Sequence, residues 1–254
     1  MVFGGITVVA SLAVAIPALG LAVVAGALAP VLALSYASRI AAGSAVDAAT
    51  LLAALRTLAL RGGRPRAEPL MQALCAGLLA LAVVPFVLHP TLAAAARAAA
   101  CVVLLVLALI DARCGLLPDA LTLPLMWAGL LLSWAGAGVP LDDAVVAAAA
   151  SYLALWGLNR CFEAWRGQAG MGGGDMKLAA ALGAWLGWQP LPGLLLGACV
   201  AGIFFALPVP GRRGWRASLP FGPFLAVAGA FGLVGEPVVQ FLFCLGNVLC
   251  TRSV

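Results

Sequence analysis

The sequence predicts an all-α fold, a polytopic bundle of about eight transmembrane helices, and three observations predict it. Of the 254 residues, 65% are hydrophobic and 9% are charged, whereas an ordinary soluble domain is about 25% charged. The mean hydropathy is +1.14. The apolar residues are gathered in runs that approach the roughly 20 residues needed to cross a bilayer. A soluble domain is therefore excluded, and so is a disordered chain, because disorder requires low hydrophobicity.

Eight apolar runs provide the expected spans. Because the first charge along the chain is Arg39, the first run is expected to remain as a membrane anchor and not to be a cleaved signal peptide. The sixth run is short, and the glycine-rich stretch before it could complete it. A ninth apolar piece, Pro237 to Cys250, either spans the membrane or lies on its surface. The eight runs cover roughly residues 5–36, 69–88, 91–110, 119–138, 144–160, 176–188, 191–209 and 220–235.

The loop of residues 38–68 is the only sizeable connection between the predicted spans. Within it, Ala45 to Leu60 has apolar residues at helical spacing, which predicts an amphipathic helix on the membrane surface. We expect two units along the chain. The first, residues 1–68, contains one span and this short loop, and the second, residues 69–254, is the membrane-embedded domain that carries the chemistry.

The basic residues indicate how the bundle is oriented. If the spans alternate, 12 of the 14 Lys and Arg residues fall in loops on one side of the membrane, and the opposite loops carry Asp142, Asp143 and Glu236. Cytoplasmic loops are enriched in Lys and Arg, so we expect the N-terminus outside and those loops in the cytoplasm. The formal net charge of +5 then reflects topology, and no nucleic-acid partner is expected. The 12 residues are Arg39, Arg56, Arg61, Arg64, Arg66, Arg113, Arg160, Arg166, Lys177, Arg212, Arg213 and Arg216.

The seven cysteines form no Cys-x-x-Cys pair, and most of them lie within apolar runs. Scattered cysteines of this kind are typical of small buried side chains rather than of a disulfide framework or a zinc site. The chain also contains a single histidine. No metal site is therefore expected.

Two aspartates are the strongest candidates for chemistry, because ionisable groups at membrane depth are costly and are functional candidates by default. Asp111 ends the third run after ten uncharged residues, and Asp175 follows three glycines at the start of a helical run. Both lie on the predicted cytoplasmic face, on different helices, so they could converge. The other acids have simpler explanations. Helix capping explains Asp119, Asp142 and Asp143, and a surface ion pair near Arg160 and Arg166 explains Glu163.

Two carboxyl groups held close together cannot both ionise easily, so they share a proton. One then acts as a general base on a water molecule, while the protonated partner polarises a scissile carbonyl, as in aspartic proteases. This chemistry needs no metal, cofactor or histidine. Gly172, Gly173 and Gly174 permit backbone angles closed to other residues and would let an extended substrate chain lie beside the loop.

Three blocks in this order resemble the type IV prepilin peptidases, which are membrane aspartic peptidases with a Gly-x-Gly-Asp motif. The blocks are DARCGLLPDALTLPLMWAGL at 111–130, GMGGGDMKLAAALGAWLGWQP at 170–190 and LPFGPFLAVAG at 219–229. The resemblance covers roughly residues 100–235. It implies that Asp111 and Asp175 are the catalytic pair, with Asp111 preferred over Asp119. The substrate-binding loop would then consist of Gly172, Gly173, Gly174 and Lys177.

The resemblance also implies a substrate and a location. The family cleaves the short basic leader of type IV prepilins or type II secretion pseudopilins at the cytoplasmic border of the bacterial inner membrane. These substrates and membrane lipid are the expected partners. Glu163 or Asp119 would be a hypothetical acidic contact for the leader.

A second activity of the family is methylation of the new N-terminus from S-adenosylmethionine. Members that have it typically carry a large first cytoplasmic loop with two zinc-binding Cys-x-x-Cys pairs and a Gly-Ser-Phe-Leu-Asn type motif. Here the first loop, Arg39 to Glu68, has no cysteine, and the segment PVLALSYASR hardly matches that motif. We therefore expect no zinc, no cofactor for the peptidase, and S-adenosylmethionine only if a methyltransferase activity is retained.

Three other interpretations remain open. In a transporter, Asp111 and Asp175 would carry protons, and repeated halves with broken spans would be expected, but the sequence shows no such symmetry. An inactive scaffold of the pilus or secretion machinery is the second alternative. A presenilin-like intramembrane protease would share the Gly-x-Gly-Asp motif, but the Leu-Leu-Pro-Asp and Pro-Phe-Gly-Pro segments favour the prepilin group.

Overall fold

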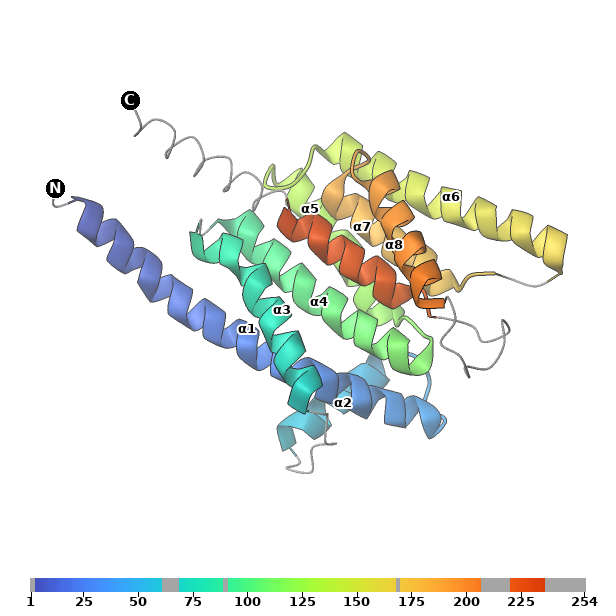
Figure 1. Ribbon diagram of the computed structural model, residues 1–254, viewed down its shortest axis with the longest axis horizontal. Coiled ribbons are helices and arrows are strands. Elements are labelled where there is room, and N and C mark those ends of the chain that lie inside the picture. The colour runs from blue at the N-terminus through green and yellow to red at the C-terminus, as the bar shows by residue number, and fades with distance from the viewer. Residues whose placement is uncertain (1–2, 61–68, 89–90, 168–169, 207–219, 236–254) are drawn as a thin grey trace.

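A computed structural model describes residues 3–60, 69–88, 91–167, 170–206 and 220–235 (Figure 1). These residues form helices and contain no strand, which confirms the all-α prediction. Eight helices are labelled in Figure 1, and one more, Gly222–Gly235, follows them and is drawn in red. The labelled helices are α1 (Phe3–Ala41), α2 (Ala48–Leu60), α3 (Pro69–Leu88), α4 (Leu92–Cys114), α5 (Asp119–Trp134), α6 (Leu141–Arg166), α7 (Gly173–Leu186) and α8 (Leu191–Ala206).

Each of the eight predicted spans corresponds to one helix, and α2 corresponds to the predicted surface helix. Within the described residues, three helical segments are long and apolar enough to cross a membrane: Ala18–Ala41 of α1, α4 and α6. Shorter apolar helices accompany them, including α5, α8 and Gly222–Gly235. The ninth apolar piece and the loop carrying Arg212, Arg213 and Arg216 lie outside the described residues.

α7 forms the centre of the bundle and packs against α5 and α6. Two glycines allow the close approach. A Cβ atom on Gly183 would lie 2.7 Å from the carbonyl of Ala147 in α6, and one on Gly129 of α5 would lie 2.7 Å from the Trp185 indole. That indole donates a hydrogen bond to the carbonyl of Leu125 at 2.8 Å. Small residues therefore fix the spacing of these helices, as is common between membrane helices.

α1 crosses α3 and α4 on the other side of the bundle. The crossing with α3 is tightest at Gly26, where a Cβ atom would lie 2.5 Å from the backbone of Ala76. α2 then returns beneath α1, and the Asp47 carboxylate before it accepts the backbone N–H of Thr50 at 2.8 Å. This cap starts α2 at Ala48 rather than at the predicted Ala45.

One side of α2 packs against the protein. Leu51 and Ala54 are buried with Tyr36 of α1 and Ile110 of α4 in a small apolar cluster. The Arg39 guanidinium donates to the carbonyl of Ala53 at 3.2 Å. The helix is therefore anchored to the bundle beside the C-terminal end of α4.

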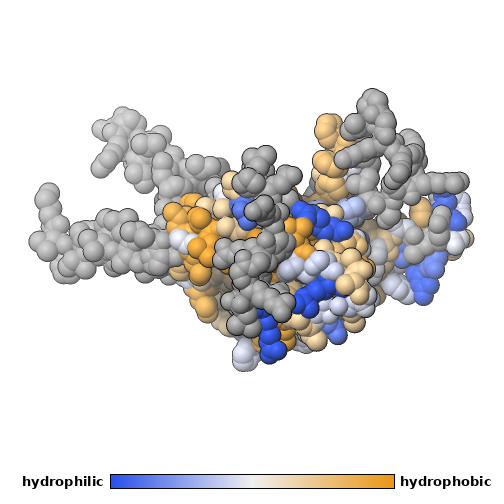
Figure 2. All heavy atoms as spheres, turned by 90° about the horizontal axis from the view of Figure 1, so that it is seen from below, coloured by the Kyte–Doolittle hydropathy of each residue, from blue (hydrophilic) through white to orange (hydrophobic). Residues whose placement is uncertain are grey.

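The outer surface of the bundle is rich in large apolar side chains. Phe204 of α8 and Phe231 are 79% and 70% exposed, as expected of helices that face lipid. Seen from below, hydrophilic side chains gather over the middle and right of the face, and the left is strongly apolar (Figure 2). Charged groups are thus unevenly distributed, as in a protein whose ends lie in water and whose flanks lie in lipid.

Candidate active site

Asp111 lies in the last turn of α4. The helix ends at Cys114, because Gly115 takes the left-handed conformation (φ 65°) and donates its N–H to the Asp111 carbonyl at 2.8 Å. The Asp111 side chain is only 4% exposed. The turn after Gly115 then leads through Leu117 to α5, so the carboxyl lies at the end of one helix and beside the start of the next.

Asp175 lies in the first turn of α7. Gly172 occupies the N-cap position with extended backbone angles (φ −71°, ψ 146°). The backbone N–H of Asp175 donates to the Gly172 carbonyl at 3.2 Å. The Asp175 carboxyl lies near Gly172, since a Cβ atom on that glycine would lie 3.7 Å from Oδ2. The N-terminal end of a helix also favours negative charge.

The structure brings these two buried carboxyl groups together. Gly222, which faces Asp111, and Gly174, which precedes Asp175, both approach Leu117. Leu117 packs between their supporting segments, because Cβ atoms on Gly174 and Gly222 would lie 2.8 Å and 3.2 Å from its side chain. The convergence expected from the sequence is therefore present in the fold, and the catalytic role of the pair is a proposal developed below.

Gly222, at the start of the helix Gly222–Gly235, faces Asp111. Its backbone amide interacts with the Asp111 carboxyl, and a Cβ atom on Gly222 would lie 2.5 Å from Oδ2 of Asp111. Within the part of the chain that the structure describes, Oδ2 is buried and has no hydrogen-bond partner. Gly222 lies in the third sequence block, but nothing in the sequence around it indicates a role. Its closeness to Asp111 depends on helix packing that a linear sequence does not show.

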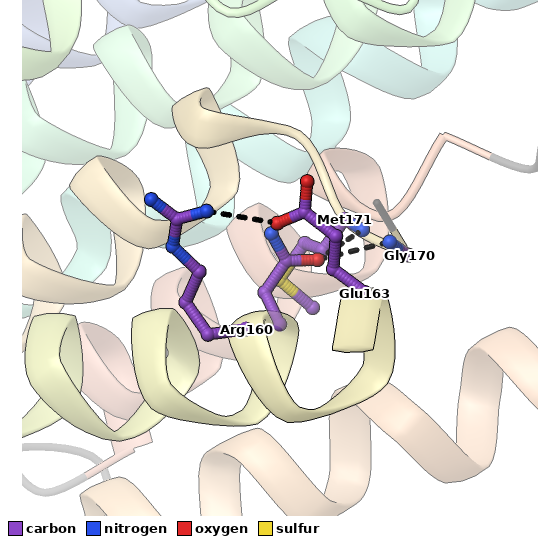
Figure 3. A network of polar contacts seen from close by, with 5 residues as sticks. Arg160, Glu163, Gly170 and Met171 are labelled. Carbon is purple, nitrogen blue, oxygen red and sulfur yellow. Dashed lines mark hydrogen bonds and ion pairs between the residues drawn. The ribbon is translucent and has the colours of Figure 1, made fainter. Parts of the chain in front are cut away.

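Asn159 of α6 bonds to Gly170 and Met171, which are labelled in Figure 3 and begin the segment that leads to Gly172. Its Oδ1 accepts the backbone N–H groups of Gly170 and Met171, each at 2.9 Å. Phe162, one turn further along α6, packs against Gly170, where a Cβ atom would lie 2.7 Å from the ring. Sequence reasoning missed Asn159, although an isolated amide in a predicted span was an available signal.

Lys177 and Asp119 form an ion pair that joins α7 to α5. The Lys177 ammonium donates to both Asp119 oxygens, at 2.6 Å and 2.8 Å. Lys177 follows Asp175 by two residues, so the two side chains leave α7 on different sides. The expectation that Asp119 caps α5 is wrong, because Pro118 occupies the N-cap position and no side chain caps that helix end.

The expectation of capping is also wrong for Asp142 and Asp143. Pro140 is the N-cap residue of α6, and the two acids lie in its first turn, where they still favour the helix electrostatically. The expected ion pair of Glu163 is confirmed, since Arg160 donates to it at 3.1 Å.

The described cysteines, Cys75, Cys101, Cys114, Cys161 and Cys199, are all free. The first two are buried, as expected of small apolar side chains, whereas Cys161 and Cys199 are exposed. No group of three or more His, Cys, Asp or Glu side chains that could hold a metal occurs among the described residues. The Asp111 and Asp175 carboxyls are therefore the main chemical feature of this part of the chain.

The fold and site together define a class, a polytopic all-α membrane protein with a buried pair of aspartates where helix ends meet. Residues 98–207 match the type IV leader peptidase family, and this matched segment contains Asp111 and Asp175. No solved structure matches the chain.

Several curated relatives are named prepilin leader peptidase/N-methyltransferase. The protein of Aeromonas salmonicida is 49% identical over 142 residues, which are 55% of this chain and 49% of the relative. That of Burkholderia pseudomallei is 46% identical over 181 residues, 70% of this chain and 57% of the relative. That of Dickeya chrysanthemi is 52% identical over 130 residues, 50% of this chain and 46% of the relative. The chain thus spans about half the length of the curated relatives it matches.

Proposed function

We propose that the protein is a membrane aspartic endopeptidase that removes the basic leader peptide from type IV prepilins or type II secretion pseudopilins. The observation that carries this proposal is the buried pair formed by Asp111 and Asp175 at the ends of two helices. The leader peptidase domain at residues 98–207 supports the substrate class. We further propose that residues 69–254 form the peptidase unit, preceded by the span and short loop of residues 1–68.

The carboxyl pair supplies both an acid and a base. Because both groups are buried near each other, the pair holds one proton at neutral pH. The ionised member removes a proton from a water molecule, whose oxygen forms a bond to the scissile carbonyl carbon, and the protonated member donates its proton to the carbonyl oxygen. The carboxyl that took the water proton then donates it to the amide nitrogen, the carbon–nitrogen bond breaks, and one hydroxyl of the diol gives its proton to the other carboxylate as the carbonyl re-forms. Oδ2 of Asp111, buried and without a partner among the described side chains and amides, has acceptor capacity for such a proton or water.

The glycine segment offers the substrate a place to bind. Gly172 and Gly173 are exposed, and a Cβ atom on Gly173 would meet nothing within 4 Å. An extended substrate strand lying beside this backbone would present its carbonyl to Asp175. In this proposal Gly174 allows Leu117 to pack closely against α7, whereas Gly172 and Gly173 leave room for the substrate backbone.

The proposed orientation places the carboxyl pair at the cytoplasmic border of the inner membrane, with lipid around the bundle and no nucleic-acid partner. The enrichment of Lys and Arg in the loops on this side supports it. A basic leader meets two acids that already have partners, since Asp119 pairs with Lys177 and Glu163 with Arg160. A leader cation that contacts either acid would have to compete with the internal one.

S-adenosylmethionine would be used only if a methyltransferase activity is retained. The names of the curated relatives include N-methyltransferase, and the chain covers about half of each. The first loop lacks the cysteine pairs that the methylating members typically carry. We therefore propose peptidase activity without a cofactor and treat methylation as a separate outcome.

The test is an intact-mass measurement of the product N-terminus. The purified protein in detergent is incubated with several prepilin-like substrates and S-adenosylmethionine. We expect loss of the leader without an added methyl group. A product that carries a methyl group would show that the cysteine-free N-terminal region still supports methyl transfer. No cleavage of any substrate would contradict the proposal and favour the transporter or scaffold.

A further inference from the structure

Outside the carboxyl pair, Asn159 makes polar contacts with the backbone that leads to Asp175. It projects from α6 near the end of that helix, it is half-buried, and its side-chain oxygen accepts two consecutive backbone N–H groups. Its neighbour Arg160 instead forms an exposed ion pair with Glu163. Figure 3 shows the two features next to each other. Of these two polar contacts, only that of Asn159 is made with the segment that leads to Asp175.

The segment 170–172 has no regular secondary structure, so its backbone amides must find partners elsewhere. Asn159 supplies one for Gly170 and one for Met171. The side chain of Met171 packs against the main apolar core, and Phe162 lies against the bare Cα of Gly170. Four contacts thus fix the two residues immediately before Gly172.

The position of Gly172 determines the position of Asp175. Gly172 is the N-cap of α7, its carbonyl accepts the N–H of Asp175 at 3.2 Å, and a Cβ atom on it would lie 3.7 Å from Oδ2 of Asp175. A shift of the segment before Gly172 would therefore move the first turn of α7, which carries the carboxyl. Removing the Asn159 oxygen would leave two amides to seek water and would release this segment.

We propose that Asn159 is a positioning residue for proteolysis, which holds the Gly170–Gly172 backbone so that Gly172, the N-cap of α7, keeps the first turn of that helix and its Asp175 carboxyl in place. The inference rests on the proposed peptidase function. It assigns a role in the reaction to a residue that does not contact the carboxyl pair, because Asn159 acts only through the backbone of residues 170–172.

The experiment compares four forms of the full chain in detergent: the parent, Asn159→Ala, Asn159→Asp and the neighbouring control Arg160→Ala. Cleavage of one prepilin-like substrate gives kcat and KM. Because a misplacement of about 1 Å can cost about 100-fold in rate, we expect kcat of Asn159→Ala to fall by about 10- to 100-fold with little change in KM. Asn159→Asp keeps an acceptor oxygen for both amides and should restore kcat to within a few-fold of the parent. Arg160→Ala should match the parent in kcat.

Parent-like kcat in Asn159→Ala would overturn the proposal. So would equal losses in Asn159→Asp and Asn159→Ala when both are folded, because the acceptor oxygen would then not be what matters. Hydrogen exchange of the parent is a second measurement that needs no variant to fold. We expect the amides of Gly170 and Met171 to be protected, and rapid exchange of both would equally overturn the proposal.

A failure of the peptidase assignment would look different. If Asp111→Asn and Asp175→Asn both cleave like the parent, the proposed function fails, whatever Asn159 does. If those two variants are inactive and Asn159→Ala is fully active, the function stands and only the positioning role of Asn159 is excluded.

Discussion

Gly222 provides the space that the Asp111 carboxyl occupies. A Cβ atom at this position would lie 2.5 Å from Oδ2 and 2.9 Å from Cγ of Asp111, both far closer than ordinary van der Waals contact. The glycine and the aspartate are far apart in the chain, and they meet because the helix Gly222–Gly235 begins where α4 ends. Since the group in the way is the end of a side chain, it can rotate aside.

The substitution Gly222→Ala should therefore reduce cleavage much more than stability. The added methyl group displaces the Asp111 carboxyl, and a displacement of about 1 Å can cost about 100-fold in rate. Cleavage rate and thermal melting, measured on the same detergent preparation, would check this. Gly235→Ala, at the other end of that helix and with open space around it, is the control. A Gly222→Ala variant with parent-like kcat would contradict the close contact.

Asp111→Asn and Asp175→Asn should each abolish cleavage and leave the protein in the membrane. Asn is nearly isosteric with Asp but can neither hold the shared proton nor act as a base. Membrane fractionation and a gel-shift assay of a prepilin-like substrate measure the two properties separately. Near-normal cleavage by either variant would show that the pair is not catalytic.

Asp119→Asn and Lys177→Met should each retain most of the cleavage activity. Their ion pair is partly exposed, and such pairs contribute about 0.2–1 kcal/mol to stability. A double-mutant cycle on thermal stability should give a coupling energy in that range. A large increase in KM for Lys177→Met alone would instead assign Lys177 to substrate binding, as the family resemblance implies. An inactive Asp119→Asn variant would show that Asp119 has a further role.

Gly183→Ala should destabilise the bundle, whereas Gly157→Ala should not. A Cβ atom on Gly183 would lie 2.7 Å from the backbone of Ala147, which cannot rotate aside, but Gly157 of α6 has nothing within 4 Å. Overpacking of this kind costs about 1–3 kcal/mol. Thermal unfolding of the two variants in one detergent measures the difference. Equal melting temperatures would contradict the tight α6–α7 crossing.

The helices were largely predictable, because a helix that lies in lipid needs a long run of apolar residues, and such runs are visible in the sequence. Every predicted span became a helix. The N-cap residues of α5 and α6 were predicted wrongly, because Pro118 and Pro140 take the positions that the following acids were expected to hold. Proline has a fixed φ and no N–H, so the helix begins after it and the acids move into the first turn.

The candidate site was predictable only in part. Asp111 and Asp175 were selected because a charge at membrane depth is rare, and that signal is local. Asn159 and Gly222 contact residues that are remote in sequence. Neither residue is charged, so neither produces the signal that marked the two aspartates. Which side of α7 faces which helix decides their roles, and this depends on packing at Gly183, Gly129 and Gly229.

The docking of Gly222–Gly235 against Asp111 has a consequence for the biogenesis of the protein. A ribosome completes both aspartates before it reaches residue 222, so a nascent chain holds the two acids before it holds the helix end that contacts one of them. In the proposed peptidase, the carboxyl pair would reach its packed geometry only after the helix Gly222–Gly235 has entered the bundle, and cleavage would begin late in synthesis.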